Sequence, residues 1–141
     1  MTYITISEVG PRDGLQSVDT ILSTEGKLAW IEAEYGAGVR EIEVGSFVSP
    51  KLLPQMADTA AVVKGALHHK DLVIAVLVPN LRGCEAALEA GAHKISIPLS
   101  LSETHSLKNV RRDHAQMLEE IAACQALVNQ VAEAERPNFE V

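Results

Sequence analysis

The 141-residue sequence is poor in several residue types, and each shortage argues against a class of function. It has 12 lysines and arginines against 19 aspartates and glutamates, a net charge of −7, with no cluster of basic residues. A nucleic-acid partner is therefore not expected, because binding to a phosphate backbone needs concentrated positive charge. No apolar run approaches the roughly 18 residues of a membrane-spanning helix, so we expect no membrane partner.

Cysteine is also scarce. Cys84 and Cys124 both lie in helical patterns, and we interpret them as reduced core thiols rather than as a catalytic or metal-binding pair. Met1 leads directly into a strand-like segment, without the pattern of a secretory signal. Together these features predict an intracellular, cytoplasmic protein.

The sequence does contain a repeated alternation of strand and helix patterns. Alternating or wholly apolar segments predict four strands and the start of a fifth, at residues 3–9, 39–44, 72–78, 93–98 and 137–141. Helical spacing of apolar residues follows each of the first three strands. After the fourth strand we expect a loop over residues 99–108 and then one long helix, with an apolar stripe from Val110 to Val131.

An internal repeat supports this order. Residues 37–44, AGVREIEV, align with residues 90–97, AGAHKISI, at an offset of 53 residues that spans two strand–helix units. At about 26 residues per unit, eight units would need roughly 210 residues, and a (β/α)8 barrel typically takes about 250. The predicted fold is therefore α/β, the N-terminal half of a (β/α)8 TIM barrel, with residues 1–141 forming four βα units and the start of a fifth strand. A doubly wound sheet is the alternative, but the first strand–helix turn lacks its G-x-G-x-x-G pattern.

A charged turn, VGPRDGLQ at residues 9–16, follows the first predicted strand. Active sites of barrels form at the C-terminal ends of the strands, so this turn is a candidate site. Asp13 offers carboxylate oxygen to a divalent cation such as Mg²⁺ or Mn²⁺. Arg12 offers a planar set of donors to a developing oxyanion. The alternative interpretation is a surface salt bridge between the two residues.

Glu43 lies on the second predicted strand between Ile42 and Val44. Because those two apolar side chains face the other way, Glu43 is predicted to point into the barrel. A carboxylate in that position needs a partner. It either pairs with Arg12 or belongs to a metal site.

Further polar residues stand at or beyond the ends of the other predicted strands. Ser46 and Asn80 are candidates for substrate binding, with turn formation or helix capping as the alternative. His105 either lines the site or is a solvated loop residue. His68 and His69 follow a predicted helix, and we interpret them as complementing its dipole. The remaining candidates are Gln16, Ser100 and Ser102.

Two segments go further and resemble a known family. EVGPRDGLQ at residues 8–16, and SFVSPK at 46–51 followed by PQMAD at 54–58, resemble the 3-hydroxy-3-methylglutaryl-CoA lyases, which are metal-dependent (β/α)8 enzymes. The resemblance extends over essentially the whole chain. It implies that Asp13 is a metal ligand and that Arg12 is the catalytic arginine beside the acyl thioester. It also implies that three residues line the site: Gln16, Glu43 and Ser46.

The resemblance implies a reaction as well: metal-dependent retro-Claisen cleavage of a 3-hydroxyacyl-CoA to acetyl-CoA and a keto acid. The family's other metal ligands, a His-x-His pair and an asparagine, have no counterpart in this chain, and neither does its catalytic cysteine. The chain alone is therefore expected to be inactive. The alternatives are a lyase for another branched 3-hydroxyacyl-CoA and a non-catalytic half-barrel that serves as an assembly module.

A half-barrel is expected to leave unpaired strand edges and an uncovered inner face. We expect that face to be apolar, and the chain therefore to form a homo-oligomer or to pair with the remainder of the barrel. The side chains predicted to line this inner face are Ile4, Ile6, Ile42, Val44, Val76, Val78, Ile95 and Ile97.

Overall fold

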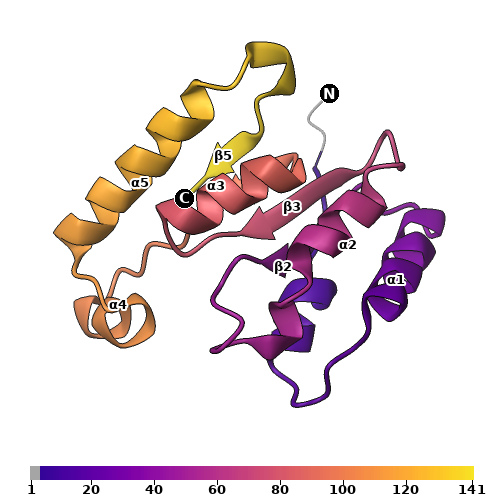
Figure 1. The fold of residues 1–141 in the computed structure, drawn as a ribbon, viewed down its shortest axis with the longest axis horizontal. Coiled ribbons are helices and arrows are strands. Elements are labelled where there is room, and N and C mark those ends of the chain that lie inside the picture. Colours follow the sequence, from indigo (N-terminus) through magenta and orange to yellow (C-terminus); the bar gives the residue numbers. More distant parts are fainter. Residues whose placement is uncertain (1–3) are drawn as a thin grey trace.

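The computed structural model describes residues 4–141, and its five strands form one parallel sheet in the order β1-β2-β3-β4-β5. The strands are β1 (Ser7–Glu8), β2 (Glu41–Ser46), β3 (Val73–Leu77), β4 (Lys94–Ser96) and β5 (Asn138–Glu140). The helices are α1 (Thr24–Gly36), α2 (Thr59–Ala66), α3 (Leu81–Ala90), α4 (Glu103–Val110) and α5 (His114–Asn129) (Figure 1). Three short turns complete the chain: η1 (Gly10–Gly14), η2 (Pro54–Met56) and η3 (Glu133–Glu135).

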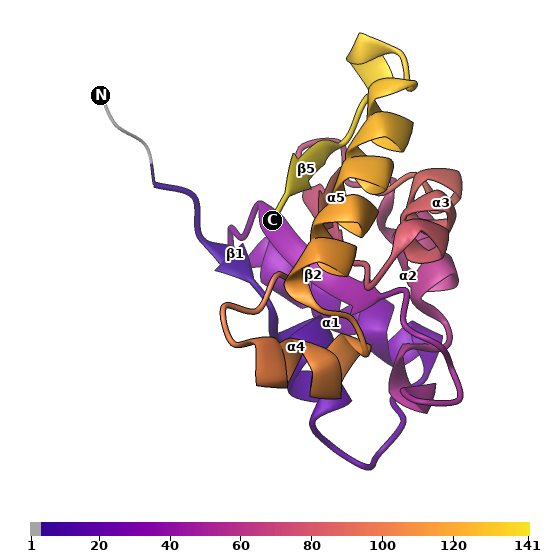
Figure 2. The same ribbon diagram turned by 90° about the vertical axis from the view of Figure 1, so that its left-hand side faces the viewer.

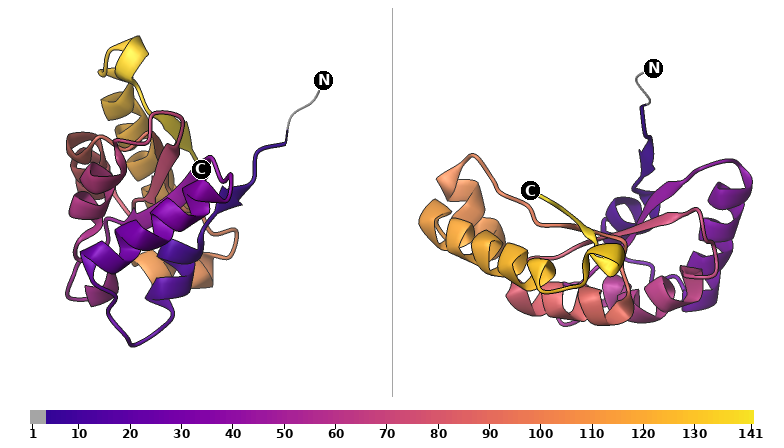
Figure 3. Two further views of the ribbon diagram at one scale, coloured as in Figure 1. Left: turned by 90° about the vertical axis from the view of Figure 1, so that its right-hand side faces the viewer. Right: turned by 90° about the horizontal axis from the view of Figure 1, so that it is seen from above.

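Successive strands are neighbours throughout, and the helices lie along one face of the sheet (Figure 3). A doubly wound sheet would place helices on both faces and reverse its strand order. The observed arrangement is instead that of the first half of a (β/α)8 barrel, as the sequence predicts. No helix within residues 4–141 is long and apolar enough to span a bilayer.

The helix-covered face of the sheet carries the apolar core. Ile42, Ile74, Val76 and Ile95 are each 0% exposed and belong to one cluster with residues from the helices. The sequence-based assignment of inner-face residues was therefore wrong at Ile42, Val44, Val76, Val78, Ile95 and Ile97, which are all buried at 0–1% exposure. In a barrel these positions pack outward against the helices, and the alternation of the strand sends their neighbours inward.

The open face of the sheet carries charged side chains from β2, β4 and β5. Glu43 pairs in register with Ala75, and Ala75 pairs with Lys94. The Lys94 ammonium lies 3.0 Å from Glu41 and 2.6 Å from Glu140, and hydrogen bonds to Glu140 and Glu41 raise the pKa of Lys94. Charged residues of β2, β4 and β5 therefore interrupt the face that was expected to be apolar, and the unpaired edges of β1 and β5 remain a reason for association.

The first strand is much shorter than residues 3–9. Only Ser7 and Glu8 pair with β2, while Ile4 and Ile6 are 89% and 78% exposed. Figure 2 shows this segment leading away from the helices. Within residues 4–141 the two isoleucines remain largely uncovered, so an alternating pattern here does not indicate a buried strand. Tyr3, which the prediction included, lies outside the described residues.

The predicted long helix corresponds to α5 and begins only at His114, while a separate helix, α4, occupies most of the predicted loop. Ser102 caps α4 by accepting from the His105 N–H, and Asp113 starts α5 with a capping box that includes Gln116. Between them Arg111 adopts a left-handed conformation, with φ 57°. The loop predicted at residues 99–108 is therefore correct only as far as Ser102, and His105 is helical.

A buried charge joins α1 to η2. The Lys27 side chain is 2% exposed, and its ammonium donates to the Gln55 carbonyl at 2.5 Å and to an Asp58 carboxylate oxygen. The other Asp58 oxygen accepts from Thr24 Oγ1 at 2.7 Å. The PQMAD segment at residues 54–58 therefore has a structural role, because its Asp58 neutralises the buried ammonium of Lys27 on α1.

The two cysteines lie in the core, as the sequence predicts. Cys84 and Cys124 are free thiols at 0% exposure, and Cys84 Sγ is 4.0 Å from the Cys124 carbonyl oxygen. A side-chain hydrogen bond with Cys84 and the burial of the Cys124 side chain both raise the pKa of the Cys124 thiol. This thiol therefore stays protonated, which disfavours nucleophilic chemistry.

Candidate functional site

The charged turn after β1 forms a short π-helical segment, η1, in which Pro11 is buried. The Asp13 N–H donates to the Val9 carbonyl at 2.7 Å, which closes the turn. Gly10 lies so close to α1 that an added Cβ would be 3.0 Å from the Trp30 ring. Glycine therefore lets the turn pack closely on α1, and this packing sets the position of Arg12 and Asp13 beyond the end of β1.

Arg12 lies between two carboxylates. Its Nε donates to Glu43 on β2, and its Nη1 lies 2.9 Å from the Asp13 carboxylate. The side chains of Arg12 and Glu43 are 15% and 11% exposed, whereas that of Asp13 is 60% exposed. Of the two sequence-based alternatives for Glu43, the structure shows the ion pair with Arg12. Glu43 holds the guanidinium in place, and Asp13 stays accessible.

A cleft of about 630 Å³ opens beside this ion pair. Its lining brings together Arg12, Gln16 and Asn80, from the turns after β1 and β3. The Asn80 side chain also caps α3 by accepting from the Gly83 N–H at 2.9 Å, so the capping role expected of it is present. The apolar residues that line the cleft are Val48, Leu52, Leu53, Leu77, Pro79, Pro98 and Val110.

Ser46 ends β2 next to a smaller cavity of about 430 Å³ that Asn80 also lines. Its Oγ is buried and has no hydrogen-bond partner among residues 4–141. The backbone here is held from the helix side: Thr59 Oγ1 donates to the Ser46 carbonyl at 3.0 Å. A Cβ at Gly45 would lie 2.5 Å from the same Thr59 oxygen, so only glycine fits. An unpaired buried hydroxyl of this kind is suited to a ligand contact.

The candidates after β4 do not join the cleft. His105 Nδ1 is 2.7 Å from Ser100 Oγ, and Ser102 is occupied with capping α4. None of these three residues lines the cleft around Arg12.

The structure adds basic residues that sequence reasoning missed. Arg111 and Arg112 line the same cleft as Arg12, with Arg112 Nη2 3.5 Å from Glu120. In a chain of net charge −7, three arginines line one cleft and supply the hydrogen-bond donors that an anion would need, although Arg12 and Arg112 also pair with carboxylates. The helix break at Arg111 brings these residues to the cleft, and the caps at Ser102 and Asp113 were the only sequence signals of that break.

The donor chemistry of Asp13 fits a hard divalent cation as one ligand of a larger set. Only one of its oxygens bonds to Arg12, and the side chain is exposed. Mg²⁺ and Mn²⁺ favour carboxylate oxygen. Arg12 bonds to one oxygen of each carboxylate, but the Asp13 side chain is 60% exposed and that of Glu43 only 11%, so Asp13 is the carboxylate that a cation can reach.

Comparison with known proteins gives a consistent result. A family model described as HMGL-like matches residues 3–140. The chain is 44% identical over 115 residues to hydroxymethylglutaryl-CoA lyase YngG of Bacillus subtilis, covering 82% of this chain and 38% of the relative. It is 50% identical over 107 residues to the mitochondrial hydroxymethylglutaryl-CoA lyase of Macaca fascicularis, and this match covers 76% of this chain and 33% of the relative. It is 42% identical over 107 residues to a Pseudomonas aeruginosa protein named 3-hydroxy-3-isohexenylglutaryl-CoA/hydroxy-methylglutaryl-CoA lyase, covering 76% and 36%.

Solved structures agree with these matches. An HMG-CoA lyase from A. baumannii, in complex with coenzyme A and 3-methylmalate, aligns with a TM-score of 0.86 at 37% identity, covering 99% of this chain and 45% of that one. The Bacillus subtilis HMG-CoA lyase aligns with a TM-score of 0.85 at 39% identity, covering 90% and 43%. The chain thus spans less than half the length of the proteins it matches.

Proposed function

The chain belongs to the HMGL-like family, and on that basis we propose that residues 1–141 form the N-terminal part of a TIM-barrel catalytic domain. The proposed activity is metal-dependent cleavage of a 3-hydroxyacyl-CoA to acetyl-CoA and a keto acid, with 3-hydroxy-3-methylglutaryl-CoA as the first candidate substrate. The observation that carries the proposal is the Arg12–Glu43 ion pair beside an exposed Asp13 at the C-terminal end of the sheet. Active sites of barrels form at that end.

Asp13 would hold the cation, with the remaining ligands supplied from outside this chain. A bound Mg²⁺ or Mn²⁺ supplies Lewis-acid polarisation of substrate oxygens. A ligand could also bond to Ser46 Oγ, which is buried without a hydrogen-bond partner among residues 4–141. The cytoplasmic location expected from the sequence stays a prediction, because the names of the relatives include both mitochondrial and cytoplasmic enzymes.

Arg12 would offset the negative charge that develops on the thioester oxygen when the bond between C2 and C3 breaks. Its Nε is occupied by Glu43 and its Nη1 by Asp13, and Arg12 lines the cleft, so Nη2 is the nitrogen that remains for a substrate oxygen. A guanidinium anchored in this way does not need to reorganise as the charge appears. Glu43 therefore acts as a positioning residue for Arg12.

The walls of the cleft fit an acyl-CoA. Arg111 and Arg112 would bind the anionic groups of coenzyme A, while Gln16 and Asn80 would contact the acyl portion. The apolar lining residues Val48, Leu52 and Leu53 also support a second candidate, a longer branched 3-hydroxyacyl-CoA. The name of the Pseudomonas aeruginosa relative includes such a substrate.

A further part of the proposal concerns the open face of the sheet. We propose that it is covered by the remainder of a barrel, which would also pair with the free edges of β1 and β5. The assembly module without catalysis remains the competing hypothesis. That hypothesis predicts that the open face of the sheet is covered by a partner, but that Asp13 binds no metal.

The metal role of Asp13 has a direct test in a chimera in which residues 1–141 replace the matching part of the Bacillus subtilis lyase. Asp13→Asn is expected to weaken Mn²⁺ binding by at least about tenfold, because a neutral amide loses the charge that holds the cation. Titration calorimetry with Mn²⁺ measures the change. Asp19→Asn, an exposed aspartate in the following loop, serves as the matched control. Equal Mn²⁺ affinity in the chimera and its Asp13→Asn variant would remove Asp13 from the metal site.

A further inference from the structure

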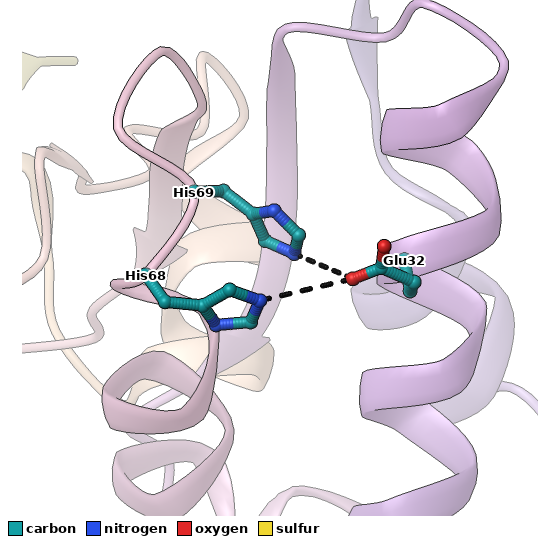
Figure 4. Close-up of side chains that lie close together, drawn as sticks. All are labelled: Glu32, His68 and His69. Atoms are coloured by element: carbon teal, nitrogen blue, oxygen red, sulfur yellow. Dashed lines mark ion pairs between the residues drawn. The ribbon is translucent and has the colours of Figure 1, made fainter.

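A second cluster of ligand-type side chains lies away from the cleft. Glu32 projects from α1, and His68 and His69 project toward it from the segment that follows α2 (Figure 4). That segment leads into the N-terminal end of β3, whereas the cleft lies at the C-terminal ends of the strands. The cluster is therefore at the opposite end of the sheet and takes no part in the proposed lyase chemistry.

Both histidines face the same carboxylate oxygen. Nε2 of His69 is 3.0 Å and Nε2 of His68 is 3.7 Å from Glu32 Oε2. The three ligand atoms all lie within 4.8 Å of one another. In a tetrahedral zinc site, bond lengths of about 2.0–2.2 Å place neighbouring ligand atoms roughly 3.4 Å apart. The two distances to Glu32 lie on either side of that value, and the third pair of ligand atoms lies within 4.8 Å, so side-chain movements would bring all three atoms to a cation.

The surroundings of the histidines orient them for binding. His68 Nδ1 is 2.8 Å from the Gly65 carbonyl oxygen, which can only accept, so the Nδ1 nitrogen carries the hydrogen. The neutral His68 ring then presents the Nε2 lone pair toward Glu32. A backbone carbonyl that fixes the tautomer in this way is the usual partner of a metal-binding histidine.

His69 is the rigid member of the cluster. It is 7% exposed, and its ring lies 4.2 Å from the Tyr35 ring and 3.9 Å from the His68 ring, centroid to centroid. Glu32 and His68 are 63% and 66% exposed and can adjust. One fixed ligand and two adjustable ligands allow the site to close around an ion.

We propose that Glu32, His68 and His69 form a binding site for Zn²⁺ on the outer wall of the half-barrel. Two imidazoles and one carboxylate are ligands typical of zinc, and three protein ligands leave the fourth position to water. Mg²⁺ and Mn²⁺, which favour oxygen, are excluded as preferred occupants. The site would link α1 to the connection between α2 and β3. The sequence-based interpretation of the two histidines as complements to the dipole of α2 did not anticipate their convergence on α1.

The test is titration calorimetry of the 141-residue chain with Zn²⁺ at neutral pH in excess Mg²⁺, together with thermal unfolding. We expect one Zn²⁺ per chain and a higher melting temperature with the ion, because a ligand that binds the folded state stabilises it. Glu32→Gln and His68→Gln are each expected to weaken Zn²⁺ binding by about tenfold or more. Both side chains are exposed, so the variants should fold.

A matched control separates this site from others. Glu25→Gln makes the same change on an exposed residue of α1 outside the cluster. It is expected to keep wild-type Zn²⁺ affinity. The inference is overturned if Zn²⁺ binds the double variant Glu32→Gln/His68→Gln as tightly as the wild type, or does not bind the wild-type chain in excess Mg²⁺.

Discussion

Arg12→Lys in the chimera is expected to lower kcat by about 10²–10³-fold, with Mn²⁺ affinity unchanged. The guanidinium reaches Glu43 with Nε and Asp13 with Nη1 while a further nitrogen remains for the substrate. Lysine has a single ammonium on a flexible stem and cannot reproduce that fork. The group that meets the developing charge would therefore be lost, while the carboxylate of Asp13 would remain.

Steady-state kinetics and Mn²⁺ calorimetry on the same samples measure this prediction. Arg40→Lys is the matched control, because Arg40 is an exposed arginine that pairs with Asp71 at 3.0 Å, away from the cleft. It is expected to leave kcat and KM unchanged. A kcat for Arg12→Lys within about threefold of the parent, a difference of well under 1 kcal/mol, would exclude Arg12 from charge stabilisation.

Asp58→Ala is expected to lower the free energy of unfolding of the 141-residue chain by about 3 kcal/mol. The variant leaves the ammonium of Lys27 buried with only the Gln55 carbonyl, and it also removes the acceptor of Thr24 Oγ1. An unpaired buried charge is among the costliest defects that a single substitution can create.

Lys27→Met provides the matched comparison, measured by urea unfolding under the same conditions. It removes the buried charge itself and keeps the apolar stem, while Asp58 is 24% exposed and can be solvated. We therefore expect Lys27→Met to cost less than Asp58→Ala. If the two variants are equally destabilised, or Asp58→Ala is nearly neutral, the ion pair does not have the role assigned to it.

The sequence predicted the strand order and the half-barrel well, because parallel strands and their helices have distinct local periods. It was wrong about the inner face. Alternation in β2 shows that Ile42 and Glu43 point to opposite sides, but the apolar set belongs against the helices and the charged set inside. The predicted long helix was correct from His114 onward but began too early, because the apolar spacing from Val110 crosses the break before Asp113.

The candidate site could be predicted only where its residues are close in sequence or share a strand pattern. Arg12, Asp13 and Glu43 met these conditions, and the ion pair inside the barrel was one of two stated alternatives for Glu43. Arg112 reaches the cleft only because α4 and α5 are separate. The approach of Glu32 to His69 depends on how α1 and α2 pack, and spacing along the chain contains no signal of it.

The central claim is that this chain carries one half of a metal-dependent lyase site. The most direct measurement is Mn²⁺-dependent release of acetyl-CoA from 3-hydroxy-3-methylglutaryl-CoA, compared between the 141-residue chain and the chimera. We predict release by the chimera, abolished by Asp13→Asn, and none above background by the chain alone. Release by the pure 141-residue chain, or a chimera that folds by circular dichroism yet releases no acetyl-CoA, would contradict the claim.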